Sequence, residues 1–346
     1  MRKRVYSGIR ATGRLHLGNY FGAVKGMLAL QDKYDCIFSV VDMHTITVPY
    51  DVKTLKQSVR EIILDYLAAG LDPKKCNLEI QSQVPQHTEL AYLLSTIYPV
   101  SRLEDLPTYK EKKAQYPKYI NMGLLYYPVL MAADVLLYKA ELVPVGIDQE
   151  PHLEVMREIA RKFNSMFSST FPEPQRFETT EEYKYIPSLF GEGKMSKSVE
   201  GSYINLTDNL DIIKARVAKI PTDSGHGTIK QKKGPLTEEK IKKFINENNE
   251  EARGTAVLME LVELFEGKPR RSELEKIYTT GYVKYGEVKQ ELAQAIYKEL
   301  QPFQERRKEF LENSKLVDSI IKESQQKCLH MAEETMQEVR SKMGLA

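Results

Sequence analysis

The sequence predicts an α/β protein with a doubly wound parallel sheet, followed by a C-terminal all-helical domain. In the first half of the chain short β-rich runs alternate with helical patterns, and after about Asp208 long amphipathic helical patterns replace them. The nearly continuous apolar run Cys36–Val41 is typical of a strand covered on both faces of a parallel sheet. Strand, helix and strand in this order imply a doubly wound sheet, which binds ligands beyond the carboxyl ends of its strands.

Four short segments of the first half are candidate strands: Val5–Ile9, Cys36–Val41, Leu78–Ile80 and Leu142–Val145. Between the second and the third, apolar residues recur at helical spacing, at Leu55, Val59, Ile62, Ile63, Tyr66 and Leu67. Asp51 stands where an N-cap belongs and Gly70 where a C-cap glycine belongs, with Pro73 following. These signals predict a capped helix.

The second half reads as helical. Its apolar residues recur on one face of each pattern, at Leu292, Ile296, Tyr297, Leu300 and Phe303, and again at Phe310–Leu311. The stretch Pro221–Pro235 is rich in Gly, Lys, Ser and Thr and predicts a loop or hinge. We therefore expect a boundary between Leu206 and Pro221, with residues 1–207 as the first domain and 208–346 as the second.

The composition is typical of an ordinary soluble, globular enzyme. Of 346 residues 42% are hydrophobic, and the net charge of +2 leaves nucleic-acid contacts to local basic patches. The three cysteines, Cys36, Cys76 and Cys328, form no CxxC pair, so we expect no disulfide framework and no protein-ligated metal. The basic N-terminus lacks an apolar signal-peptide core and no apolar stretch is long enough to span a bilayer, so we expect a cytoplasmic protein.

The first chemical motif is the segment Gly8–Tyr20, which follows the first predicted strand and leads into a helical pattern. A glycine turn at a helix N-terminus offers free N–H groups and a partial positive charge, which together favour a triphosphate. Gly18 leaves room for a nucleotide, and the side chains of His16 and Asn19 are candidate donors to phosphate oxygens. The alternative is a plain strand–turn–helix connection.

The second motif is Lys194-Met195-Ser196-Lys197-Ser198, preceded by Gly191 and Gly193. Two lysines on a glycine-hinged loop can close over a polyphosphate and stabilise the charge that builds on departing pyrophosphate. The alternative is a solvated basic loop.

The third motif is the apolar segment Tyr127–Tyr138, which carries one acid. Met131 and Asp134 share a helical face, with Tyr127 just upstream. A carboxylate among apolar residues needs a donor partner. Asp134 is therefore a helix cap, an ion-pair partner of an arginine, or the acceptor of a hydrogen bond from a ligand.

Thr12–Tyr20 and Lys194–Ser198 resemble the two ATP-binding motifs of class I aminoacyl-tRNA synthetases, at opposite ends of a Rossmann-like domain. Tyr127–Tyr138 resembles the tryptophan-binding helix of the tryptophanyl-tRNA synthetases, and Met131 stands where the tyrosine enzymes usually carry Gln. The resemblance covers nearly the whole chain. It implies that the tryptophan carboxylate attacks the α-phosphate of Mg·ATP, and that the acyl group then moves to the 3′ end of tRNA(Trp).

The resemblance also implies roles for individual residues. The expected catalytic residues are His16, Asn19, Lys112, Lys194 and Lys197. The expected ATP-binding residues are Arg10, Ala11, Thr12, Gly18, Asn19, Gly146, Ile147, Asp148, Ile186, Lys194, Met195, Ser196, Lys197 and Ser198. The expected tryptophan-binding residues are Tyr6, Gly8, His44, Tyr127, Met131, Asp134 and Gln149, with Asp134 accepting the indole N–H. The segment Ile80–His87 is expected to be architectural.

The implied partners are tRNA(Trp), L-tryptophan, ATP with Mg²⁺ and a second copy of the chain, with no iron–sulfur cluster and no membrane. Tyr285–Lys289 and Pro302–Arg306 resemble the helical anticodon-binding part, and Lys230, Lys232 and Lys233 are candidate phosphate contacts.

The chain departs from the family pattern at two positions of the first motif. Arg10 stands where one branch has Gln, and Ala11 where Pro is usual. Arg10 is expected to pair with either the tryptophan carboxylate or an ATP phosphate.

Three rival functions fit parts of the pattern. They are a tyrosyl-tRNA synthetase, a small-molecule nucleotidyltransferase, and a non-catalytic RNA-binding relative. The last would have lost His16 or Lys197, and both are present.

Overall fold

The computed structural model describes the chain except for residues 1, 178–185, 192, 198, 226–249 and 346. Its contacts divide the chain into two compact units. The sheet unit comprises Met1–Gly13, Met27–Thr180 and Phe310–Ala346, and the helical unit comprises Arg14–Gly26 and Glu181–Glu309. The boundaries between these two units therefore differ from the expected domain boundary between residues 207 and 208.

The sheet unit contains a five-stranded, wholly parallel sheet in the order β3-β2-β1-β4-β5. The strands are β1 (Arg4–Ile9), β2 (Asp35–Val40), β3 (Cys76–Ile80), β4 (Leu142–Val143) and β5 (Gln175–Arg176). The four predicted strands are confirmed, and β5 was not predicted because it is two polar residues long. The chain reverses direction across the sheet between β1 and β4, which is where doubly wound sheets bind ligands.

Helices cover both faces of this sheet, as the continuous apolar run of β2 predicts. Alternate residues of a strand point to opposite faces. Ile37 belongs to the core formed with α5, α8, α9 and α15, whereas the ring of Phe38 lies 6.4 Å from that of Tyr66 on α4. The helices of the unit are α3 (Asp42–Thr45), α4 (Val52–Ala69), η2 (Gln81–Gln83), α5 (Gln86–Ser95), α6 (Val100–Glu104), α7 (Pro107–Gln115), α8 (Met122–Leu137), η3 (Ile147–Gln149), α9 (Glu150–Phe167) and α15 (Ser314–Met343).

Helix α4 has the predicted caps. The carboxylate of Asp51 accepts a hydrogen bond of 2.9 Å from the Lys53 N–H, and Gly70 takes a left-handed conformation with φ of +111°. Both features satisfy backbone groups that a helix end leaves free.

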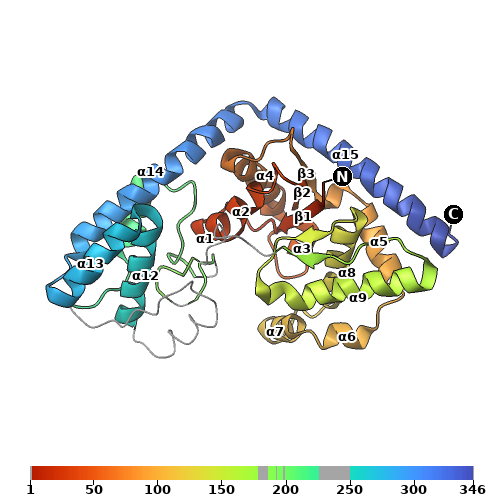
Figure 1. Ribbon diagram of the computed structural model, residues 1–346, viewed down its shortest axis with the longest axis horizontal. Coiled ribbons are helices and arrows are strands. Elements are labelled where there is room, and N and C mark those ends of the chain that lie inside the picture. The colour runs from red at the N-terminus through yellow and green to blue at the C-terminus, as the bar shows by residue number, and fades with distance from the viewer. Residues whose placement is uncertain (1, 178–185, 192, 198, 226–249, 346) are drawn as a thin grey trace. The chain divides into compact units, whose positions relative to one another are not determined.

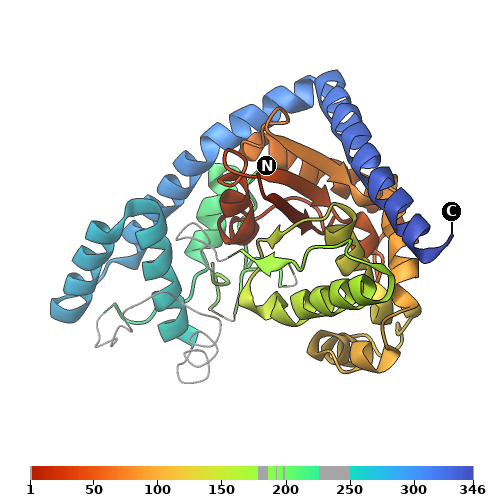
Figure 2. The same ribbon diagram turned by 45° about the vertical axis from the view of Figure 1, so that its right-hand side comes forward.

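The C-terminal helix α15 covers the edge of the sheet. In both views it runs, in blue, beside the orange helix α5 (Figures 1 and 2). The Ser324 hydroxyl accepts a hydrogen bond of 2.5 Å from the Leu78 N–H, and the Gln325 side chain accepts one of 3.1 Å from the Ile80 N–H. Both N–H groups belong to the outer side of β3, so α15 closes an edge that would otherwise be open to pairing with another strand.

The helical unit contains C-terminal helices, as the fold class predicts, together with the segment Arg14–Gly26. Its helices are α1 (Leu17–Asn19), η1 (Tyr20–Val24), α10 (Leu210–Ala218), α12 (Glu250–Glu266), α13 (Lys268–Thr280) and α14 (Tyr285–Glu312), and α2 (Lys25–Leu28) lies at the unit boundary. Arg271 links α13 to α12 through ion pairs of 2.7 Å with Glu260 and Glu263. No helix among the described residues is long and apolar enough to cross a membrane.

Candidate active site

Polar side chains follow the carboxyl ends of three neighbouring strands. Arg10 follows β1, His44 lies in α3 after β2, and Gln81 opens η2 directly after β3. Because these strands are parallel, their carboxyl ends meet at one edge of the sheet, where ligands bind. Two of the three side chains contact Asp134.

Asp134 is the centre of this site, with 1% of its surface exposed. Its Oδ2 lies 2.8 Å from His44 Nε2, and its Oδ1 accepts a hydrogen bond of 2.8 Å from Gln81 Nε2. His87 Nδ1 lies 2.7 Å from the same Oδ1. Burial opposes ionisation, but these neighbours outweigh it and hold the pKa of Asp134 well below its usual range. Asp134 is therefore an ionised acceptor inside α8 and not a helix cap, and its partners among the described residues are two histidines and a glutamine, with no arginine.

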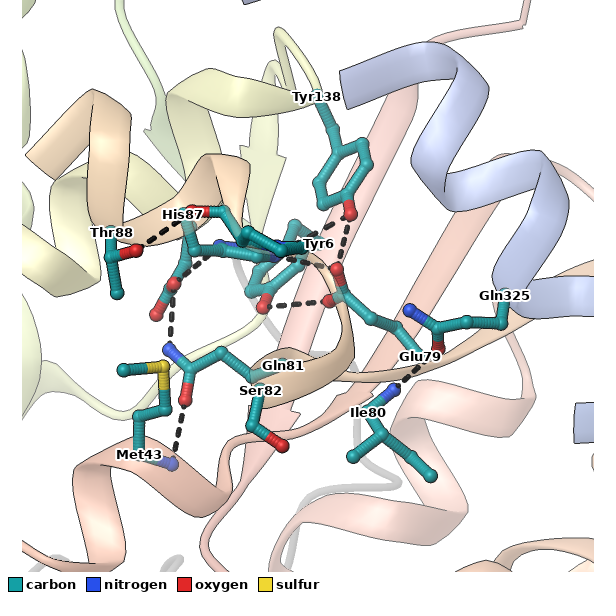
Figure 3. Close-up of polar contacts among 12 residues, drawn as sticks. Tyr6, Met43, Glu79, Ile80, Gln81, Ser82, His87, Thr88, Tyr138 and Gln325 are labelled. Carbon is teal, nitrogen blue, oxygen red and sulfur yellow. Dashed lines mark hydrogen bonds and ion pairs between the residues drawn. The ribbon is translucent and has the colours of Figure 1, made fainter. Parts of the chain in front are cut away.

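The orientation of Gln81 is set by a second hydrogen bond. Its Oε1 accepts from the Met43 N–H at 3.0 Å (Figure 3). Its amide nitrogen is therefore the group that faces Asp134. Gln81 itself has no exposed surface.

A second buried carboxylate, Glu79 of β3, lies on the other side of the His87 ring from Asp134. Its Oε1 lies 2.6 Å from His87 Nε2 and also accepts a short hydrogen bond from the Tyr138 hydroxyl. Its Oε2 accepts from the Tyr6 hydroxyl at 3.2 Å (Figure 3). Tyr6, expected to bind tryptophan, thus has its hydroxyl directed at Glu79, while its ring stacks on Tyr138 at 5.8 Å.

The side chain of Tyr127 is fixed by contacts with Thr108, His152 and His44. Its hydroxyl lies 2.8 Å from Thr108 Oγ1 and 2.7 Å from His152 Nε2, and its ring meets the imidazole of His44 edge-on at 6.2 Å. Burial lowers the pKa of His152, which favours its neutral form. Tyr127, Met131 and Asp134 follow one another along one face of α8, as their spacing predicts.

Two cations, Arg10 and Lys112, act on each other in the sheet unit, and the one acid whose charge acts on Lys112 among the described residues is the adjacent Glu111. Burial and the positive charge of Arg10 lower the pKa of Lys112. The Arg10 Nε is buried and has no hydrogen-bond partner in the described part of the chain. Lys112 Nζ donates to the neutral Gln115 Oε1 at 2.9 Å and lies 5.6 Å from the centre of the Tyr116 ring. Two close cations with free donors favour an anion.

The helical unit brings the first two sequence motifs together. Leu17 N–H donates to the Ile204 carbonyl at 2.9 Å, and Leu206 N–H donates to the Leu15 carbonyl at 3.0 Å. This short pairing sets His16 opposite Asn205. Asn19 Oδ1 accepts from the His16 N–H at 3.3 Å, which fixes the turn at the start of the helix.

The lysine loop is anchored on the same unit. Met195 N–H donates to the Ile186 carbonyl at 2.9 Å, and Ser188 N–H donates to the Gly193 carbonyl at 2.7 Å. Gly193 has a φ of +107°, which the turn between these partners requires. A side chain at Gly18 would come within 2.9 Å of the His16 ring and 3.0 Å of Met195 Cβ, so glycine is needed for the two motifs to pack.

His16 is 5% exposed and its Nδ1 has no hydrogen-bond partner among the described residues. Burial, with the charges of Lys197 and Lys194, lowers its pKa to about 4. A neutral imidazole beside two cations is suited to contact an anionic ligand without titrating near neutral pH.

The expected site residues thus fall into two groups. The helical unit assembles His16, Gly18, Asn19, Ile186, Lys194, Met195, Ser196 and Lys197, and the sheet unit holds Tyr6, Gly8, Arg10, Ala11, Thr12, His44, Lys112, Tyr127, Met131, Asp134, Gly146, Ile147, Asp148 and Gln149. Ser198, Lys230, Lys232 and Lys233 lie outside the described residues.

Sequence reasoning missed Glu79, Gln81 and His87. The available signal was polar residues immediately around the end of an apolar strand, in a segment expected to be architectural. No group of three or more His, Cys, Asp or Glu side chains suited to a metal ion occurs in the described part of the chain.

A wholly parallel doubly wound sheet, together with a His-x-Gly-Asn turn bonded to the Lys-Met-Ser-Lys loop through Lys197 and the Arg14 carbonyl, is typical of a class I tRNA synthetase. Residues 1–301 match the family described as tRNA synthetases class I (W and Y).

Comparison with similar proteins identifies the family within this class. The tryptophan–tRNA ligase of Clostridium tetani is 37% identical over 99% of this chain and 96% of its own, and that of Fusobacterium nucleatum is 39% identical over 99% and 98%. A crystal structure of tryptophanyl-tRNA synthetase from Campylobacter jejuni, complexed with ADP and tryptophan, matches with a TM-score of 0.82 and 31% identity over 99% of this chain and 100% of that one. The chain belongs to the tryptophan–tRNA ligase family.

Proposed function

We propose that this chain activates L-tryptophan with ATP, giving tryptophanyl-adenylate and pyrophosphate, and transfers tryptophan to the 3′ end of tRNA(Trp). The observation that carries the proposal is the buried, ionised Asp134 among apolar residues of α8. A buried acceptor of this kind selects a ligand that brings its own N–H and rejects one that lacks it. The similarity to tryptophan–tRNA ligases supports the same amino acid over tyrosine.

In the proposed reaction a tryptophan carboxylate oxygen forms a bond to the α-phosphorus of ATP, and the bond from that phosphorus to the bridging oxygen breaks. Negative charge builds on pyrophosphate. His16, Asn19 and the helix N-terminus supply donors to the phosphates, and Lys194 and Lys197 supply positive charge. Mg²⁺ accompanies ATP as part of the substrate and adds further charge compensation.

Tryptophan is bound in the sheet unit in this proposal. The indole N–H donates to Asp134, while the thioether of Met131 and the ring of Tyr127 offer apolar contacts to the indole. His44 both bonds to Asp134 and meets Tyr127 edge-on, so it ties the polar and aromatic sides of the site together. Tyr6, Gly8 and Gln149 complete the proposed tryptophan site.

Arg10 and Lys112 are proposed to bind the negative charge of the substrates. Their mutual repulsion, and the unsatisfied buried Arg10 Nε, are relieved by an anion. A phosphate of ATP and the carboxylate of tryptophan remain the two candidates. Ala11, Thr12, Gly146, Ile147, Asp148 and Ile186 are proposed ATP contacts, together with Gly18, Met195, Ser196 and Ser198.

A homodimer is proposed as the working form. Large apolar side chains are exposed on neighbouring parts of the sheet unit, with Tyr92 at 67%, Val100 at 57% and Met122 at 72%. Nearby, Tyr119 and Ile120 line a hollow of about 570 Å³. Apolar surface gathered in this way favours a protein partner. Light scattering should give about twice 39.8 kDa, and a mass of 39.8 kDa would contradict the dimer.

We propose residues 1–207 as the part that carries the ATP and tryptophan sites, and residues 208–346 as the anticodon-binding part, with α15 packed on the sheet. A cytoplasmic location suits Cys36, Cys76 and Cys328, which are free thiols as expected in a reducing compartment.

Amino-acid-dependent exchange of pyrophosphate into ATP tests the activity. Exchange with tryptophan is expected. Exchange with tyrosine and not tryptophan would favour the tyrosine enzyme, and no exchange with either would favour an RNA-binding role without catalysis.

A further inference from the structure

His87 and Glu79 form a buried pair in the core of the sheet unit, and the proposed chemistry uses neither. Neither has exposed surface. His87 is the second residue of α5, and Glu79 lies in β3, eight residues earlier. The ring of His87 reaches two carboxylates at once, because Nε2 lies 2.6 Å from Glu79 Oε1 and Nδ1 lies 2.7 Å from Asp134 Oδ1.

The two contacts define the charge of the ring. A carboxylate oxygen only accepts hydrogen bonds, so Nε2 must carry a proton to bond Glu79, whereas Nδ1 faces Asp134 Oδ1 at ion-pair distance without hydrogen-bond geometry. Burial opposes the charge of His87, but Glu79 and Asp134 outweigh it and raise its pKa to about 10. His87 is therefore an imidazolium between two buried carboxylates.

These contacts also leave one acceptor position on Asp134. Each carboxylate oxygen offers about two lone pairs. Oδ1 accepts the hydrogen bond from Gln81 and faces His87 Nδ1 at ion-pair distance, whereas Oδ2 has His44 as its one described partner. The second lone pair of Oδ2 has no donor among the described residues, so one acceptor position remains.

Glu79 is itself held from several elements. Tyr6 of β1 and Tyr138 at the end of α8 both donate hydroxyl hydrogen bonds to it, as Figure 3 shows. The next residue, Ile80, is fixed by Gln325 of α15. Glu79 is thus held on several sides, and His87 is the described residue whose ring lies within ion-pair distance of both Glu79 and Asp134.

We propose that His87, anchored by Glu79, is a positioning residue that sets the preference of the enzyme for an amino acid with an indole N–H. The proposal rests on Asp134 being the indole acceptor. Without the imidazolium, two carboxylates of like charge would share a buried site, and one would take up a proton. A protonated or rotated Asp134 no longer presents Oδ2 as an acceptor, and selection is lost.

Two neutral substitutions separate the two contacts of the ring. The amide nitrogen of Asn sits near the position of ring Nδ1, and that of Gln near ring Nε2. His87→Asn therefore keeps a donor for Asp134 and gives up Glu79, whereas His87→Gln keeps a donor for Glu79 and gives up Asp134. A positioning role predicts the larger loss of selectivity in His87→Gln, and a role in holding Glu79 predicts the reverse order.

The readout is the ratio of kcat/KM in pyrophosphate exchange for tryptophan and for β-(3-benzothienyl)-L-alanine, in which sulfur replaces the indole N–H. The fraction of folded enzyme cancels in this ratio. We expect His87→Gln to lower it by about tenfold or more, as for a lost bond to a charged group, and His87→Asn to lower it less. Binding of tryptophan can be followed by ligand fluorescence, since the chain contains no tryptophan.

Equal losses of kcat/KM for both amino acids, with an unchanged ratio, would overturn the proposal and leave His87 a purely structural residue. Should His87→Gln not fold, Glu79→Gln carries the same test, because it removes the anchor and must also lower the ratio. Asp134→Asn distinguishes a failure of the proposed indole acceptor from a failure of the proposed role of His87. If Asp134→Asn leaves the ratio of kcat/KM values unchanged, Asp134 is not the indole acceptor. If Asp134→Asn removes the preference for tryptophan while the His87 variants keep it, Asp134 is the acceptor and His87 does not position it.

Discussion

The ammonium group of Lys197 donates a hydrogen bond to the backbone carbonyl of Arg14, two residues before His16. The second lysine of the loop is thus already bound to the turn that begins the first helix. Both residues belong to the helical unit, so this contact needs no movement between units. It sets the charge of Lys197 beside the imidazole of His16, where the charge acts on its pKa.

Lys197→Ala is expected to slow adenylation far more than it weakens tryptophan binding. The charge that Lys197 meets develops on departing pyrophosphate, so its contribution belongs to the transition state. A fall of about 100-fold or more in the single-turnover rate, with tryptophan affinity changed by no more than about twofold, is the expected pattern. Lys214→Ala, at an exposed lysine of α10, is the matched control. Equal losses in rate and in tryptophan affinity would contradict this role.

His16 is expected to stay neutral well below the usual histidine range. Its folded pKa of about 4 lies below the unfolded value near 6.5, so the unfolded chain binds the extra proton between these values. The free energy of unfolding should therefore fall as pH drops through this window, by up to about 1.4 kcal/mol per pH unit from this group.

NMR titration of the imidazole, assigned with His16→Asn, measures this pKa directly. Lys197→Met should raise it, because one of the two opposing charges is gone. It should remain below about 6.5, since burial is the larger cause. An unchanged pKa in Lys197→Met would mean that the two groups do not interact.

Asp134→Ala is expected to abolish the preference for tryptophan over phenylalanine. The substitution removes the acceptor and leaves the donors His44, Gln81 and His87 facing an apolar gap. Discrimination should fall by about 100-fold or more in the ratio of kcat/KM values, and stability by about 3–5 kcal/mol. Unchanged discrimination in the exchange assay would refute the indole assignment.

Much of the fold follows from local signals. The caps Asp51 and Gly70 predict the ends of α4 because they act within one helical turn. Strand β5 carries no such signal, since Gln175 and Arg176 become a strand only through pairing with Leu142 and Val143. Short polar strands depend on tertiary neighbours and not on their own pattern.

The site divides in the same way. Asp134 stands out in the sequence because a lone acid in an apolar helix requires a partner. Glu79 and His87 do not, because their burial depends on packing from segments far along the chain, including α15 about 245 residues away. The meeting of His16 with the lysine loop followed from the resemblance, and spacing alone would not have predicted the backbone pairing of Leu15–Leu17 with Ile204–Leu206.

Ser324→Ala tests the closure of the sheet edge by α15. The substitution removes the acceptor of the buried Leu78 N–H, and a buried donor left unsatisfied costs about 1–3 kcal/mol. We expect a loss of this size in the denaturant-derived free energy of unfolding, and faster hydrogen exchange at the Leu78 amide. Ser319→Ala on the same helix is the control, because its hydroxyl bonds only to Glu323 at an exposed position and should change stability by less than about 0.5 kcal/mol. Equal effects of the two substitutions would contradict a contribution of the bond to β3, because helix propensity favours alanine over serine at both positions.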